Sequence, residues 1–194
     1  MRQAALAKML VAAFTILGVV SVTALSKASA TDYYSGNKWS GSTVNMCYDS
    51  FSLGDLNIGA SAAVNELEQA KSEWNSQSSV WTLNKVNPDD FCDNWNHAVD
   101  WGRNGDLAIA WVTTSGSTIV DADTEYNIAY DWTTSHSCSE PFTMDYVANH
   151  EFGHWVKFDH PAQSATSVMV PSYDCNKYDE VQAHDSSSLE DIYG

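Results

Sequence analysis

Alternating and periodic apolar positions divide the middle of the chain into a strand and a long helix. Residues 43–48 (Thr-Val-Asn-Met-Cys-Tyr) alternate between polar and apolar side chains, which is typical of a half-buried strand. Apolar side chains then recur every three or four residues, at Ala60, Ala63, Val64, Leu67, Ala70 and Trp74. This spacing places them on one face of a helix, and we expect that face to pack in the core.

Three further segments have the pattern of strands. Residues 80–86 and 107–113 are rich in apolar side chains, and the second segment is almost continuously apolar, which predicts an interior strand. Residues 119–130 instead carry acids at positions 121, 123 and 125, on one face of a strand. This polar face predicts an edge strand. A calcium site is less favoured here, because Ca²⁺ needs six or more oxygen ligands from several segments.

Two more helices are predicted in the last third of the chain. One is expected over residues 142–156, and another near the C-terminus, where Ser187-Ser188-Leu189-Glu190 has the form of a capping box. No repeat or proline-rich linker interrupts the chain. The order strand, helix, strands, helix, helix predicts a single α+β domain.

The first thirty residues have the features of a secretory signal peptide. Basic residues flank an apolar run from Met9 to Val22, and small residues at Ala28 and Ala30 suit cleavage after residue 30. The run is short for a membrane span, so an uncleaved anchor is the less favoured alternative. We therefore expect a secreted, extracellular protein with one domain over residues 31–194 and no membrane contact after cleavage.

The charge of the chain excludes one large class of function. The sequence has 9 Lys and Arg against 25 Asp and Glu, a formal net charge of −16. Cleavage after residue 30 would remove three of the basic residues and no acid, giving 6 − 25 = −19. Binding to nucleic acid requires clustered basic residues, so we do not expect it. A solvated surface, calcium sites and a salty habitat all remain compatible with this charge.

Four cysteines lie in the predicted mature part, at positions 47, 92, 138 and 175. An even number in an exported chain predicts two disulfides. Four cysteines permit three pairings; we favour Cys47 with Cys92 and Cys138 with Cys175, because each pair closes a loop within one half of the chain. No CxxC pair is present, which disfavours a cysteine-based zinc site.

A histidine-rich stretch carries the candidate chemistry. His150 and His154 are one helical turn apart and project from the same face, so two imidazoles can bind one Zn²⁺. His160 can supply a third ligand and leave a fourth position for water, which is the ligand count of a catalytic site. Glu151 lies beside them as a candidate general base. These parts fit zinc-dependent hydrolysis of a peptide bond.

The pattern HExxH followed by a third histidine resembles the metzincin metallopeptidases, whose signature continues with a methionine turn. Met169 supplies the candidate methionine, and residues 169–173 (Met-Val-Pro-Ser-Tyr) look like the methionine turn and pocket wall of matrixins. The resemblance implies that Pro171 and Tyr173 border a substrate side-chain pocket. Residues 119–127 are similar to the matrixin strand that pairs with substrate, and residues 189–194 resemble the closing helix of that domain.

Two positions depart from the matrixin pattern. Lys157 stands where the family motif has a glycine that lets the chain turn sharply towards the third histidine. A residue with a Cβ atom pays about 1 kcal/mol in the left-handed backbone conformation. Asp159 is therefore kept as an alternative ligand to His160. Pro161, directly after the last histidine, is similar to serralysins instead.

The resemblance implies a twisted mixed sheet with two long helices and a short C-terminal helix, and a secreted zinc endopeptidase acting on proteins or peptides. We expect a monomer with one catalytic Zn²⁺. The lack of an N-x-S/T acceptor after residue 30 favours a bacterial source. Two other functions are kept open: a catalytically silent zinc-containing binding module, for which Lys157 is the only indication, and a hydrolase of non-peptide amides or esters.

Overall fold

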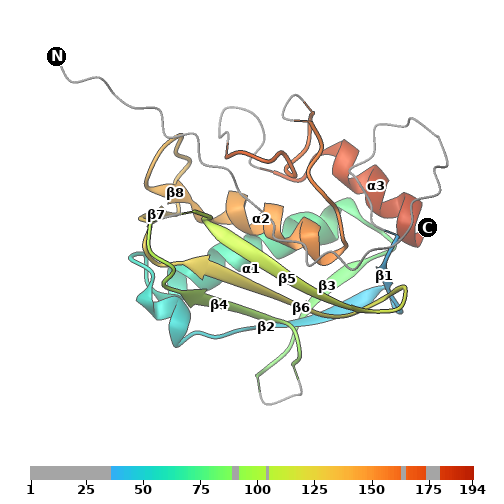
Figure 1. Ribbon diagram of the computed structural model, residues 1–194, viewed down its shortest axis with the longest axis horizontal. Helices are drawn as coiled ribbons and strands as arrows, with labels where there is room; N and C mark the ends of the chain where they lie inside the picture. The colour runs from blue at the N-terminus through green and yellow to red at the C-terminus, as the bar shows by residue number, and fades with distance from the viewer. Residues whose placement is uncertain (1–35, 89–91, 104, 163–164, 174–179) are drawn as a thin grey trace.

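The computed structural model describes residues 36–88, 92–103, 105–162, 165–173 and 180–194 (Figure 1). The predicted signal peptide, residues 1–30, lies outside the described residues. Within the described ranges, no helix is long and apolar enough to cross a membrane.

A six-stranded sheet forms one layer of the molecule. Its strands are β1 (Lys38–Trp39), β2 (Thr43–Tyr48), β3 (Thr82–Lys85), β4 (Trp95–Val99), β5 (Ala108–Ser115) and β6 (Thr118–Asn127). The order β1-β6-β4-β2-β3 is parallel throughout, and β5 pairs antiparallel with the other side of β6. Two short strands, β7 (Trp132–Thr133) and β8 (Phe142–Thr143), pair separately, and a 3-10 turn, η1 (Ser52–Asp55), follows β2. The strand predicted over residues 43–48 is confirmed.

Three helices complete the fold: α1 (Ala60–Gln77), α2 (Met144–Trp155) and α3 (Ala183–Tyr193). Figure 1 shows α1 and α2 on the same side of the sheet, and they contact each other. The apolar stripe of α1 is buried at Ala63, Leu67, Ala70 and Trp74, as its spacing predicts. The predicted α+β class, with two long helices and a short C-terminal helix, is confirmed.

The predicted positions of β5 and β6 in the sheet are wrong. Among the described residues β5 pairs only with β6 and is the edge strand, whereas β6 has neighbours on both sides. Ala122, Thr124 and Tyr126 are buried and alternate with the three acids, so the polar side chains of β6 mark a solvent-facing surface of the sheet. A polar face and an unpaired backbone edge are therefore separate properties of a strand.

The predicted start of the last helix is also wrong. The backbone N–H of Gln182 donates to the Asp185 side chain at 2.8 Å, so the capping box begins at Gln182, five residues before the predicted Ser187. Ser187 is inside α3, where its hydroxyl donates to the carbonyl oxygen of His184.

One of the two predicted disulfides joins described residues. Cys47 on β2 is bonded to Cys92, which confirms that pairing. Cys138 is also disulfide-bonded, and Cys175, its predicted partner, lies outside the described residues.

The Cys47–Cys92 bond closes a loop with a sequence separation of 45 residues. Chain-entropy arguments give about 4 kcal/mol for a loop of this length. We expect Cys47→Ala/Cys92→Ala to lower the free energy of unfolding by about 2–4 kcal/mol, measured by guanidinium denaturation with the parent protein as reference. An unchanged midpoint and slope would contradict this prediction.

Candidate active site

Helix α2 carries the first two histidines and is held by hydrogen bonds from indole rings. Trp74 of α1 donates through Nε1 to the carbonyl oxygen of Asn149, in the middle of α2, at 3.0 Å. At the C-terminal end of α2, Trp155 donates to the hydroxyl of Thr124 on β6, and Trp39 donates to the carbonyl oxygen of Trp155, both at 2.8 Å. These bonds join α2 to the neighbouring helix and to the sheet, which gives the histidine pair a rigid support.

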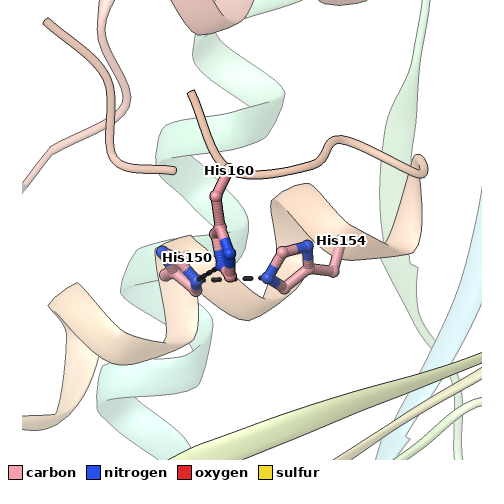
Figure 2. A group of neighbouring side chains, drawn as sticks. All are labelled: His150, His154 and His160. Carbon is pink, nitrogen blue, oxygen red and sulfur yellow. Dashed lines mark hydrogen bonds between the residues drawn. The ribbon is translucent and has the colours of Figure 1, made fainter. Parts of the chain in front are cut away.

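Three imidazoles meet above α2, as Figure 2 shows. The Nε2 atoms of His150 and His154 are 3.1 Å apart, and those of His150 and His160 are also 3.1 Å apart. All three candidate ligand atoms lie within 4.8 Å of one another. His150 and His154 are buried, whereas His160 is half-buried. The structure therefore brings together the three histidines predicted as ligands.

Hydrogen bonds to carbonyl oxygens fix two of the imidazole tautomers. Nδ1 of His150 lies 2.8 Å from the carbonyl oxygen of Val168, and Nδ1 of His154 lies 2.8 Å from that of Phe158. A carbonyl only accepts, so both Nδ1 atoms carry hydrogen and both neutral rings present an Nε2 lone pair. Two lone pairs that face each other at this distance repel unless a cation lies between them.

These donors fit a zinc ion. Tetrahedral Zn²⁺ with Zn–N bonds of about 2.0–2.1 Å places its nitrogen ligands about 3.3 Å apart, close to the separations seen here. The carbonyl bonds to Nδ1 are the kind of support that orients histidine ligands in metal sites.

Lys157 adopts the backbone conformation that the family motif assigns to glycine. Its φ is 62°, and it is the only non-glycine residue with positive φ in the described part of the chain. The N–H of Lys157 donates to the carbonyl oxygen of His154 at 2.8 Å as α2 ends. The turn brings His160 into the cluster, while Asp159 is exposed and accepts the N–H of His160. Asp159 does not join the group of candidate ligands.

Met169 lies directly against α2. A Cβ atom added at Gly153 would overlap the Met169 sulfur and lie 3.3 Å from Trp74, so the helix and the methionine approach closely because residue 153 is glycine. Met169 is fully buried.

Asp185 of α3 supports the methionine turn, and the sequence analysis missed it. Its buried carboxylate accepts hydrogen bonds from the Ser167 hydroxyl and from the N–H of Val168. The carbonyl oxygen of Val168 in turn accepts from His150. Asp185 thus acts on the histidine cluster through Val168. The only available signal was an acid placed early in a serine-rich helix, which also describes a solvated helix end.

Glu151 is buried beside the histidines, and a pocket opens next to it. Its carboxyl group accepts a hydrogen bond from the backbone of Ala110 on β5, and Oε1 has no hydrogen-bond partner among the described residues. The pocket is lined mainly by apolar side chains: Leu107, Tyr146, Val147, His150, Glu151, Val170 and Tyr173. The site thus combines a buried carboxyl group, three imidazoles and an apolar pocket.

Tyr173 contributes its ring to the pocket, and its hydroxyl is held elsewhere. The hydroxyl lies 2.6 Å from the carbonyl oxygen of Ser137 and 3.0 Å from Oγ1 of Thr143, and it accepts the N–H of Thr143. The ring packs edge-on against Tyr146 with centroids 4.7 Å apart. Pro171 is not among the lining residues, whereas its neighbour Val170 is.

Comparison with known proteins agrees with this geometry. The family model for matrixin matches residues 90–194, more than half of the chain. The chain belongs to the matrixin family. A search of curated proteins found no match. Matrixins are zinc metallopeptidases, so the family agrees with the cluster of nitrogen ligands. The bacterial source and the serralysin-like proline stay predictions.

Burial sets the charge state of the matrixin histidines. Burial, together with the neighbouring imidazoles, lowers the pKa of His150 well below the usual range and that of His154 to about 4. The pKa of His160 is also lowered by burial. All three rings are therefore neutral at pH 7, which is the form that binds a metal ion.

Burial acts on Glu151 in the opposite direction. Burial raises the pKa of this carboxyl group to about 8, even though the hydrogen bond with the Ala110 backbone acts to lower it. A carboxyl group with a pKa near neutral pH is suited to accept and return a proton.

Glycine at position 153 yields the first prediction from the active site. We expect Gly153→Ala to lower the free energy of unfolding by about 1–3 kcal/mol, because the added methyl group overpacks Met169 and Trp74. In a Met169→Ala background the methionine sulfur is gone, so Gly153→Ala should lower the free energy of unfolding by less than it does in the parent. Chemical denaturation of the four proteins measures this coupling. A more stable Gly153→Ala single variant would contradict the close approach.

The pKa of Glu151 yields a second prediction. The unfolded protein loses this proton near pH 4.5 and the folded metal-free protein near pH 8, so ionisation of Glu151 opposes folding as pH rises through that window. We expect Glu151→Gln to raise the melting temperature of metal-free protein relative to the parent, by a margin that grows from pH 5 to pH 8. The exposed residue Glu190 supplies the matched control, Glu190→Gln, for which we expect no such growth. A constant margin for Glu151→Gln would contradict the prediction.

Proposed function

We propose that this chain is a secreted zinc endopeptidase that cuts extracellular proteins or peptides, with Glu151 as the general base. The observation that carries the proposal is the buried Glu151 carboxyl group, one oxygen of which is unpartnered among the described residues, next to three converging imidazoles. His150, His154 and His160 would hold Zn²⁺. When bound, zinc supplies a Lewis acid that polarises a carbonyl group and makes water more acidic.

Glu151 moves the proton in this proposal. Its carboxylate takes a proton from the attacking water and returns it to the leaving amine. The Ala110 backbone hydrogen-bonds to this carboxyl group, and Oε1 has no partner among the described residues, so this oxygen can take the proton in our proposal. Tyr173 is assigned to substrate binding only, because its hydroxyl already contacts Ser137 and Thr143.

The substrate would bind along β5, and not along residues 119–127 as the resemblance suggested. The Asn127 N–H donates to the carbonyl oxygen of Leu107, so these two residues form a hydrogen-bonded pair of the antiparallel ladder. Every second residue of β5 is bonded to β6 in this way, and the residues between them, 108, 110 and 112, point their backbone N–H and C=O groups away from β6. These free groups can pair with an extended peptide.

The direction of the bound peptide follows from the position of the pocket. Antiparallel pairing is the more stable arrangement, and it places residues after the scissile bond near the start of β5. Leu107 lies there and lines the apolar pocket. We therefore propose that the pocket takes an aliphatic or aromatic side chain on the C-terminal side of the cut.

The remaining parts of the proposal rest on the sequence. The predicted signal peptide supports secretion, and the Cys47–Cys92 disulfide fits an oxidising compartment. We propose a monomer that binds neither nucleic acid nor, after cleavage, a membrane. The alternative of a silent binding module was based on Lys157; its positive φ allows His160 to reach the cluster, so this observation no longer favours that function.

The decisive test compares Glu151→Ala with the parent on a proteome-derived peptide library. We expect the variant to retain one zinc per chain by elemental analysis and to lose cleavage by at least about 100-fold, the size of general-base effects. Fragment mass spectrometry with and without chelator measures the cuts, and Glu190→Ala serves as the control.

Three outcomes would overturn parts of the proposal. Equal cleavage by Glu151→Ala and parent would refute the assigned base. Cleavage unaffected by chelator would refute the metal requirement. Zinc-dependent turnover of esters without any peptide fragments would indicate a hydrolase of another class.

A further inference from the structure

Lys157 places a cation on the free edge of the sheet. Its Nζ atom donates to the carbonyl oxygen of Val112 on β5 at 3.3 Å, and the residue is half-buried. Val112 belongs to the set of β5 residues whose backbone groups point away from β6, since its partner Ala122 donates its N–H to Asn94 instead. The lysine therefore occupies an acceptor on the edge where a peptide would pair.

The ammonium group of Lys157 has unused hydrogen-bonding capacity. An ammonium group has three donors, and Val112 takes one of them. None of the ion pairs between described residues involves Lys157. A half-buried cation that pairs with none of the described carboxylates gains most from an anion that arrives with a ligand.

The backbone of Lys157 makes this position well defined. The residue follows α2, its N–H is bonded to His154, and its φ of 62° directs the chain sharply into the segment that carries His160. Helix α2 lies next to β5 (Figure 1), and the bond from Lys157 Nζ to Val112 joins the end of this helix to the sheet edge.

The position along β5 indicates which substrate residue is within reach. Ala110 is bonded to Glu151 and so marks the site of the reaction, and the pocket lies at Leu107. Val112 is two residues beyond Ala110, about 6.6 Å along a strand, in the direction away from the pocket. In an antiparallel complex this direction leads to residues before the scissile bond.

We propose that Lys157 is a specificity-determining residue that binds the side-chain carboxylate of a substrate Asp or Glu on the N-terminal side of the scissile bond. This inference rests on the proposed endopeptidase function. The substrate carboxylate would accept hydrogen bonds from the two N–H groups of Lys157 that do not bond Val112. Because Lys157 already occupies the carbonyl oxygen of Val112, the main-chain pairing of the peptide with β5 would end there.

The experiment uses pairs of peptides that differ only by Glu or Gln at the second, third or fourth residue before the cut. With the zinc-loaded parent we expect a higher kcat/KM for the Glu peptide at one of these positions, by about fivefold, the size expected of a partly desolvated ion pair. Higher ionic strength should reduce the ratio. Lys157→Met should bring it close to one, and Lys157→Arg should restore it.

A matched control and a second readout separate this role from a structural one. Lys85→Met changes an exposed lysine on β3, at the opposite edge of the sheet, and should leave the ratio as in the parent. Binding of the same peptides to Glu151→Ala, measured by calorimetry, should show the same preference for Glu without any cleavage. Melting temperatures report whether Lys157→Met is folded, and the salt dependence of the parent tests the proposal without that variant.

The outcomes distinguish this inference from the proposed function. A parent enzyme that cuts Glu and Gln peptides equally at all three positions would overturn the role of Lys157 and leave the endopeptidase assignment in place. A preference that persists in Lys157→Met would overturn it as well. A zinc-loaded parent that cuts no peptide at all would overturn the endopeptidase proposal itself.

Discussion

The convergence of imidazole lone pairs in a buried site is the constraint on which the rest of the structure depends. His150 and His154 each give their Nδ1 hydrogen to a carbonyl oxygen, so their Nε2 atoms face each other at 3.1 Å with no hydrogen between them. Burial keeps these rings neutral. These facing lone pairs repel each other unless a cation lies between them. The segments that carry the three histidines must therefore be fixed in place by contacts outside the cluster.

Those contacts come from parts of the chain that are distant in sequence. Trp74 holds the middle of α2, and Trp39 holds its C-terminal end. Asp185 of α3 fixes the segment that carries Val168, and the absence of a side chain at Gly153 lets Met169 pack against the helix. The metal centre thus shares its support with the main core, so local packing and ligand geometry depend on the same buried side chains.

The free edge of β5 results from the single antiparallel pair in the six-stranded sheet. Because β5 runs antiparallel to β6 and has no other described neighbour in the sheet, its outward backbone groups are open to side chains from α2 and the turn after it. Glu151 uses one of these groups and Lys157 uses another. The free edge therefore organises the site before any peptide binds. The lysine that replaces the family glycine keeps the turn and adds a charge at the end of that edge.

The sequence by itself determined the elements whose signals are local. The spacing of His150 and His154, the apolar stripe of α1 and the strand at residues 43–48 follow from helical and strand periodicity, and the motif with its third histidine indicated the family. Only the tertiary structure decided that β5 is the edge, which residues line the pocket and how Asp185 supports His150. Strand pairing and buried hydrogen bonds join residues far apart in the chain. A polar face such as that of β6 shows where solvent lies and does not show which backbone edge is free.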